Sequence, residues 1–168
     1  MSHESRLTGE LRSLLHAQRV AALGTLSDEG SAFVSMVPYA IVVAPEPALA
    51  CLVIHVSGLA AHTRHLRARP RVSLLVMQAE VAGEPVHALP RVTLEGLAEV
   101  LEPGGQAWTA CRTAYLQRFP EAQAMTALGD FMFVAVHVKG ARQVAGFGAA
   151  RSLDADELRL ALAPAGQD

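Results

Sequence analysis

The sequence has few cysteines, few aromatic residues and no marked excess of either charge. Cys51 and Cys111 are its two cysteines in 168 residues, and they lie outside the spacings of metal or redox motifs. Two reduced, buried thiols are typical of a cytoplasmic protein. The formal net charge is -2, so we expect no binding of nucleic acid, which requires a concentrated positive surface.

Long apolar runs are missing as well. Charged residues or turn formers interrupt every apolar stretch, so no membrane-spanning helix and no membrane partner are predicted. Residues 1–15 lack the apolar core of a signal peptide, which again favours a cytoplasmic location. Apolar side chains nevertheless make up 51% of the residues, enough to build the core of one domain covering residues 1–168.

Short apolar segments bounded by turn-forming residues recur along the chain, and each predicts a β-strand. These segments are residues 19–26, 31–44, 48–56, 71–77, 91–102, 131–138 and 141–150. Short turns join most of them, and the strand–helix alternation that builds parallel sheets is missing. The pattern therefore predicts a mainly β protein with peripheral helices, an antiparallel six- to seven-stranded split β-barrel.

Four segments have helical rather than strand character. Apolar residues spaced three to four positions apart predict helices over residues 4–18 and 104–119. A third helix is expected over residues 58–68. A fourth begins near Asp154, where Glu157 three residues later completes a weak capping box.

The short helix over residues 58–68 carries the most informative polar residues. Ser57 is a plausible N-cap for it. Leu59, His62 and Thr63 share one helical stripe, so we expect the two polar side chains to face the protein body near the helix start. A helix N-terminus attracts anions, and the segment therefore predicts a phosphate-binding site.

A simpler interpretation of this segment stays open. Ser57 would only cap the helix, His62 and Thr63 would bond to backbone, and Arg64 would be solvated instead of acting as a cation beside the phosphate. A metal site is not predicted, because His62 and His65 lack the third protein ligand that catalytic zinc sites need.

Other candidate residues lie on different strands. Ser35 lies three residues before Pro38, and this proline favours an edge or irregular position for the strand. Arg91 opens a strand, where it can meet a phosphate or form a surface ion pair. Phe147 is flanked by glycines and is free to cover a flat ligand.

Asp130 precedes a very apolar strand, either as a structural cap or as a carboxylate beside a ligand. In a further strand, Gly96 predicts a bulge or bend.

Five segments in order along the chain resemble a known family. They are SMVPY (35–39), HVSGLAAHTRHLRARPRVSLLV (55–76), RVTLEG (91–96), LGDFMF (128–133) and AGFGAA (145–150). Together they are similar to the pyridoxamine 5'-phosphate oxidase-like FMN-binding split barrels, and within these to the haem-utilisation group.

The resemblance implies a homodimer with FMN in clefts shared by the two subunits. It implies that residues from four segments contact the cofactor: Ser35, Val37 and Tyr39 along the flavin, Val56, Ser57, His62 and Thr63 around the phosphate, Arg91 from the other subunit, and Phe147 closing the site. Pyridoxamine phosphate oxidases have an Arg-Lys pair where this chain has His62-Thr63, and a C-terminal segment with Trp and Arg that is missing here. Haem-degrading members pair an aspartate matching Asp130 with a later histidine, and no histidine follows His137.

Three functions follow from these observations. The first is an FMN-dependent oxidoreductase of a small-molecule substrate, with His62 and Asp130 as candidate catalytic residues. The second is a haem-binding or haem-degrading protein that uses the same dimer cleft. The third is a flavin-binding protein without catalysis. Fold alone does not separate them.

Overall fold

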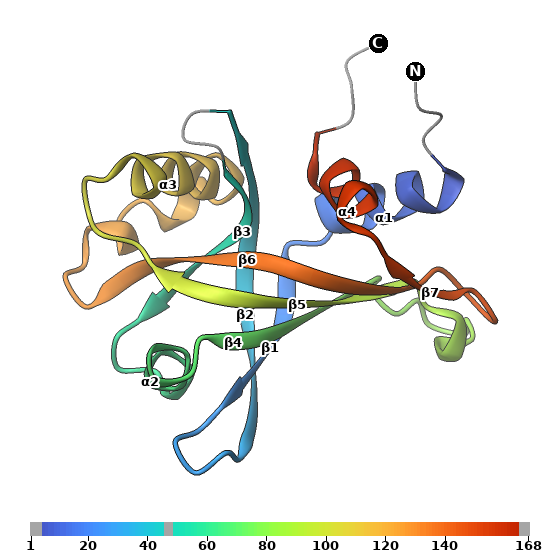
Figure 1. Cartoon of the computed structure of the whole chain (residues 1–168), viewed down its shortest axis with the longest axis horizontal. Helices are drawn as coiled ribbons and strands as arrows, with labels where there is room; N and C mark the ends of the chain where they lie inside the picture. Colours follow the sequence, from blue (N-terminus) through green and yellow to red (C-terminus); the bar gives the residue numbers. More distant parts are fainter. Residues whose placement is uncertain (1–4, 46–48, 165–168) are drawn as a thin grey trace.

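The computed structural model describes residues 5–45 and 49–164, and an antiparallel β-barrel forms its centre (Figure 1). Seven strands lie in the order β3-β2-β1-β4-β5-β6-β7, and β3 also pairs with β6, which closes the first six strands into a barrel. The strands are β1 (Val20–Leu26), β2 (Ala32–Ala44), β3 (Leu49–Ser57), β4 (Arg71–Met77), β5 (Arg91–Val100), β6 (Phe131–Val144) and β7 (Ala150–Leu153). Every pairing is antiparallel, which confirms the predicted barrel.

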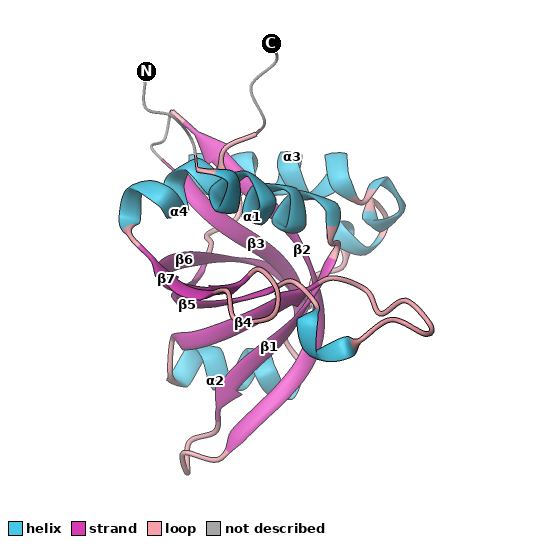
Figure 2. Ribbon diagram, turned by 90° about the vertical axis from the view of Figure 1, so that its right-hand side faces the viewer, coloured by secondary structure: helices cyan, strands magenta, loops and turns pink. Residues whose placement is uncertain are grey.

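Four α-helices surround the barrel in the described residues. They are α1 (Arg6–Ala17), α2 (Ala61–Ala68), α3 (Gln106–Arg118) and α4 (Ala155–Leu162). Helices α1 and α4 pack against each other, and α3 covers β2 and β3 (Figures 1 and 2). Helix α2 lies at the opposite end of the barrel, beside the hairpin of β1 and β2. Three short 3-10 helices follow the same chain order: η1 (Val86–Ala88), η2 (Pro120–Ala122) and η3 (Met125–Ala127).

Two apolar clusters account for the burial pattern. Inside the barrel, alternate strand residues such as Leu23, Ile54 and Leu94 are fully buried. Outside it, the opposite faces of β3 and β6 pack beneath α3, where Cys51 and Cys111 lie as free, buried thiols. Both faces of β3 are therefore covered, which explains its nearly continuous apolar sequence.

The predicted strand irregularities are confirmed. Pro38 pairs with Val20 of β1, and from Tyr39 onward β2 pairs with β3 instead, so the proline lies where the strand changes partner. The register of β5 against β6 shifts between Glu95 and Gly96, which is the expected bulge. A Cβ at Gly96 would lie 2.7 Å from the carbonyl oxygen of His137, so this close approach requires glycine.

The C-terminal segment differs from the prediction in one respect. Residues 141–150 were expected to form a separate return strand, but β6 continues unbroken to Val144. The chain then turns through residues 145–149, where Gly148 has a φ of 76°, and returns as β7 at Ala150–Leu153. The left-handed backbone of Gly148 allows the chain to reverse direction after Val144. Helix α4 follows, and its capping box of Asp154 and Glu157 is confirmed.

Candidate functional site

Ser57 lies at the end of β3, where the chain turns toward α2. Its hydroxyl donates to the Asp130 carboxylate at 3.0 Å and accepts from the backbone N–H of Leu59 at 3.1 Å. The backbone N–H of Gly58 donates to the carbonyl oxygen of Asp130 at 2.6 Å. These bonds hold residues 57–58 against the start of β6, so the helix begins at Ala61.

Two details of the predicted helix are therefore wrong. Ser57 is not its N-cap, because Ala60 occupies that position and makes no side-chain capping bond. Leu59 precedes the helix and is 88% exposed, so it does not point into the protein body. The hydroxyl of Ser57 instead joins β3 to Asp130, a residue 73 positions away.

Thr63 and Val56 hold α2 against the barrel. Thr63 is 1% exposed, and its hydroxyl donates to the carbonyl oxygen of Ser57 at 2.6 Å. Val56 is buried in the barrel core. Arg64, on the outer side of the same helix, is exposed. The Thr63 hydroxyl is thus already used within the fold.

The two histidines of α2 are held in the same way. The Nδ1 atom of His62 lies 3.0 Å from the hydroxyl of Ser35, and Nδ1 of His65 lies 3.1 Å from the hydroxyl of Thr25. Both hydroxyls come from the β1–β2 hairpin. Burial, and secondarily the nearby His65, lower the pKa of His62, which favours its neutral imidazole. A neutral ring bonded at Nδ1 is oriented to use Nε2 toward a ligand.

The structure brings some of the predicted site residues together and separates others. Hydrogen bonds join Ser57 to Thr63 and Asp130, and another joins Ser35 to His62, the neighbour of Thr63 on α2; these five residues are called the α2 site below. Its polar atoms come from β2, β3, α2 and the start of β6. This group contains both candidate catalytic residues.

Arg91 and Phe147 belong to the opposite end of the sheet. Arg91 pairs with Val144, at the far end of β6 from Asp130, and its guanidinium donates to the carbonyl oxygen of Leu89 at 3.0 Å. Phe147 follows at the β6–β7 turn and is 91% exposed. At about 3.3 Å per strand residue, roughly 40 Å of β6 separates these two ends. One chain alone therefore does not join them to the α2 site.

Val37 and Tyr39, two further predicted flavin contacts, are core residues. Val37 is 3% exposed and Tyr39 is fully buried. The Tyr39 hydroxyl donates to the carbonyl oxygen of Leu15 at 2.7 Å, and burial raises its pKa. Tyr39 thus ties β2 to α1, and its side chain lies in the barrel core.

His55 is a notable residue that sequence reasoning missed. It is 8% exposed on β3, and its ring lies 4.5 Å from the ring of Phe133, 5.1 Å from Phe131 and 5.7 Å from Tyr115, measured between centroids. Its Nδ1 atom is buried and has no hydrogen-bond partner among the described residues. The sequence shows one histidine in an apolar strand, whereas this aromatic cage requires β6 and α3 as well.

Acid should destabilise the protein partly through His55. Burial lowers its pKa below the usual value of 6.5, so as pH falls through that value the unfolded chain takes up a proton first and the free energy of unfolding decreases. We expect His55→Phe to make this decrease smaller between pH 7.5 and 5.5, as measured by urea unfolding. The exposed His87→Phe is the matched control, and equal pH slopes for the two variants would refute the assignment.

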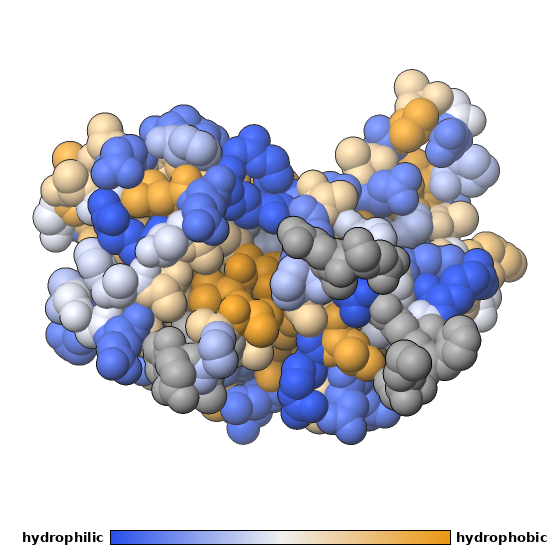
Figure 3. Space-filling model, turned by 90° about the horizontal axis from the view of Figure 1, so that it is seen from above, coloured by the Kyte–Doolittle hydropathy of each residue, from blue (hydrophilic) through white to orange (hydrophobic). Residues whose placement is uncertain are grey.

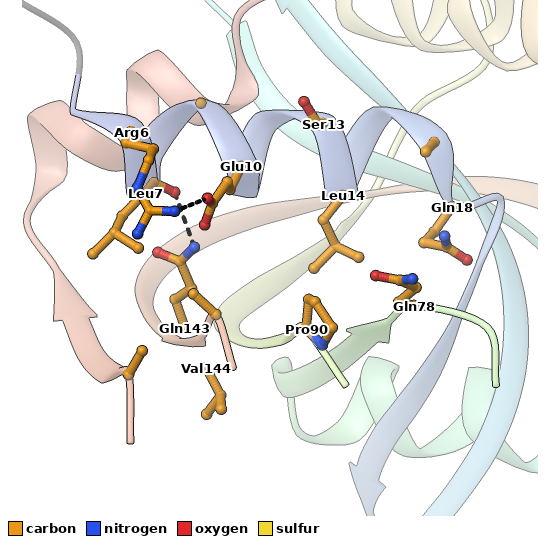
Figure 4. Close-up of a pocket in the computed structure, with 14 residues that line it drawn as sticks. Arg6, Leu7, Glu10, Ser13, Leu14, Gln18, Gln78, Pro90, Gln143 and Val144 are labelled. Carbon is orange, nitrogen blue, oxygen red and sulfur yellow. Dashed lines mark hydrogen bonds and ion pairs between the residues drawn. The ribbon is translucent and has the colours of Figure 1, made fainter. Parts of the chain in front are cut away.

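One cavity lies away from the α2 site. Its volume is about 830 Å³. It lies between α1 on one side and the β6–β7 turn and the ends of β4 and β5 on the other (Figure 4). Leu14 and Pro90 point into it, and Gln18 and Gln78 lie near one another at one side. Gln143 donates to the carbonyl oxygen of Leu7 at 2.9 Å. Arg6, Glu10 and Ser13 also line the cavity, and the Glu10 carboxylate forms an ion pair with Arg6 at 2.8 Å.

Another hollow lies between α3 and the paired helices α1 and α4. Figure 3 shows apolar surface in this hollow, and a cavity of about 370 Å³ there is lined by Ile41, Val43 and Leu162 among others. No helix within residues 5–45 and 49–164 is both long and apolar enough to cross a membrane.

The fold and the α2 site place the chain in a known class of split barrels. Residues 7–145 match the pyridoxamine 5'-phosphate oxidase family, and the chain belongs to this family. This confirms the resemblance noted in the sequence.

Individual relatives narrow the comparison. The chain is 26% identical to the haem oxygenase HutZ of Vibrio cholerae over 92% of this chain and 85% of that protein. It is 36% identical to the chloroplastic non-canonical haem oxygenase HOZ of Arabidopsis thaliana over 84% of this chain and 41% of that protein. A haem-binding protein from Mycobacterium smegmatis superposes with a TM-score of 0.80 and 29% identity, covering 94% of this chain and 61% of that one. The chain thus spans less than two thirds of the last two proteins.

Proposed function

We propose that the protein is a haem-binding homodimer that degrades haem, with the α2 site at the haem. The observation that carries this proposal is the bond between Asp130 and Ser57. It fixes a carboxylate at the position where the FMN-binding interpretation requires a phosphate. The named relatives, two haem oxygenases and a haem-binding protein, support the same choice.

The polar atoms of the α2 site fit haem better than a phosphate. A dianionic phosphate beside Ser57 would meet the Asp130 carboxylate, and like charges at short distance repel. Thr63 has no free hydroxyl proton to offer, because it donates to the carbonyl oxygen of Ser57. Haem iron, by contrast, is commonly held by a histidine, and hydrogen-bonding groups near it decide its chemistry.

Two side chains would act toward bound haem. Ser35 bonds to Nδ1 of His62, and the other ring nitrogen, Nε2, would bind the haem iron. Asp130, bonded through one oxygen to Ser57, retains its other oxygen to accept a hydrogen bond from water or to hold a proton. Bound haem would supply an iron centre for oxygen chemistry.

A second copy of the chain would complete the site. The outer faces of β1, β2 and β4 expose four apolar side chains, called the strand patch below: Val20 (47% exposed), Val34 (66%), Met36 (65%) and Met77 (42%). Contiguous apolar surface of this kind marks an interface. Dimerisation through it would also allow Arg91 and Phe147 of one copy to approach the α2 site of the other.

An FMN-dependent oxidoreductase is the second candidate function, and a noncatalytic flavin-binding protein is its variant. The start of α2 supports it, because a helix N-terminus attracts anions and Arg64 adds a cation nearby. The Asp130 carboxylate argues against FMN binding, because it would repel the phosphate of the flavin.

Absorbance titration separates these functions. Adding hemin to the purified protein should produce a Soret band that saturates at one haem per chain, whereas added FMN should keep the spectrum of free flavin. With ascorbate and oxygen, the Soret band of the haem complex should disappear. Asp130→Asn should slow that loss roughly 10- to 100-fold, and the exposed Asp156→Asn should leave it unchanged.

A perturbed FMN spectrum with no Soret band would overturn haem binding in favour of the flavin. A stable Soret band in ascorbate would limit the function to haem binding and overturn degradation.

A further inference from the structure

A groove on the outer face of the barrel has the shape and charge of a ligand site. It has a volume of about 610 Å³, within the range of small-molecule sites, and lies where β1, β2, β4 and β5 run together near the β1–β2 hairpin. Three of its residues are small: Gly24 of β1 pairs directly with Ser73 of β4, and Gly96 of β5 lies next to that pair. Gly24 and Ser73 place no large side chain on the floor of the groove, and Gly96 lies close against the carbonyl oxygen of His137.

The rim of the groove is apolar and exposed. Leu26 is 37% exposed, Phe33 40%, Val34 66% and Leu97 38%. Large apolar groups around a floor of small ones suit a flat, apolar molecule. Val34 also belongs to the strand patch, so the groove continues directly into the proposed dimer interface.

Two cations line the same groove. Lys139 stands in the β-bulge, between Val138 opposite Gly96 and Gly140 opposite Glu95, so the extra residue of the bulge is the one that supplies the amine. Bulges of this kind re-aim a side chain. Arg71 lies on β4, two strands away from Lys139 on β6, and pairs with Leu97 of the strand between them.

Neither cation is neutralised within the described residues. The side chains of Arg71 and Lys139 form no ion pair or hydrogen bond with residues 5–45 or 49–164, and Glu95 is the one acidic residue lining the groove. The groove therefore combines apolar walls with an excess of positive charge.

We propose that this groove receives the porphyrin ring of haem and that Arg71 and Lys139 bind its propionates. The ring is flat and apolar, and its two carboxylates complement the two cations. This inference rests on the proposed function, and in the dimer the groove of one copy and the α2 site of the other would form two halves of one haem site.

Hemin and its dimethyl ester, which lacks the propionate charges, test the assignment in Soret titrations. For the double variant Arg71→Ala, Lys139→Ala we expect the hemin Kd to rise about 10-fold or more, because two charge-assisted contacts are lost. The Kd of the ester for the wild-type protein should equal the Kd of hemin for the double variant, because the charge contacts are missing in both cases. The ester itself should bind the double variant and the wild-type protein with the same Kd. Glu95→Gln should tighten hemin binding about 2-fold through loss of its repulsion.

The exposed Arg67→Ala on α2 is the matched control, because it removes a cation that does not line the groove. Equal hemin affinities for this control and the double variant would overturn the groove assignment while leaving haem binding intact. Failure of hemin to bind the wild-type protein would overturn the proposed function itself. Charge-preserving Arg71→Lys should retain most of the affinity, and a loss equal to that of Arg71→Ala would indicate a structural role for the arginine.

Discussion

Replacing Met36 by glutamate is expected to convert the protein from a dimer into a monomer and to abolish haem binding with it. Met36 is 65% exposed on β2, beside Val34 in the strand patch. In the proposed interface this position is covered by a second copy, so a carboxylate there would have to be desolvated without a partner. A cost of about 3 kcal/mol raises the dimer dissociation constant more than about 100-fold.

Light scattering of the variant measures this change, and a hemin titration of the same sample measures its effect on the site. The control is Val43→Glu, which places the same charge on an apolar residue of β2 that is 47% exposed and lies outside the strand patch. If Met36→Glu remained a dimer and bound hemin like wild type, the interface would lie elsewhere.

Phe133→Ala is expected to cause the largest loss of stability among single substitutions in the layer between α3 and the barrel. Phe133 is 2% exposed, and its ring contacts those of His55, Trp108 and Tyr115 at centroid distances of 4.5, 5.9 and 5.7 Å. Truncation removes the centre of this cluster and leaves a cavity, which costs about 3–5 kcal/mol. Urea unfolding at neutral pH measures the difference.

Phe147→Ala is the matched control, because the same ring is 91% exposed at the β6–β7 turn. We expect its free energy of unfolding to stay within about 0.5 kcal/mol of the wild-type value. Phe133→Leu, which fills more of the space, should lose less stability than Phe133→Ala. Equal effects at positions 133 and 147 would show that the aromatic layer does not stabilise the fold as described.

Most of the fold was predictable because most regular elements have one face buried, and β3, covered on both faces, has a nearly continuous apolar sequence. The alternation in β1 and β4 and the leucine spacing in α1 reflect that burial directly. The capping box of Asp154 was predictable because it depends on residues three positions apart, and the bulge because a glycine inside a strand pattern indicates one. The end of β6 was missed because residues 139–140 interrupt the apolar pattern, whereas in the structure they form a bulge through which the strand continues to Val144.

The site was less predictable because its contacts are long-range. Ser57 resembles a helix cap in the sequence, but its hydroxyl bonds to Asp130, which the pairing of β3 with β6 brings alongside. The histidines of α2 gain their orientation from hydroxyls of the β1–β2 hairpin. Arg71 and Lys139 carried no motif, since the groove that they line exists only after β1, β4 and β5 are placed next to one another in the barrel.

Sedimentation velocity, followed at the Soret wavelength after one equivalent of hemin is added, tests the shared haem site most directly. The haem absorbance should sediment with a species of twice the 17.8 kDa mass of the chain, and Met36→Glu should remove haem from that species. Haem that sedimented with a single chain, or that remained free while the protein was dimeric, would contradict a site completed by two copies.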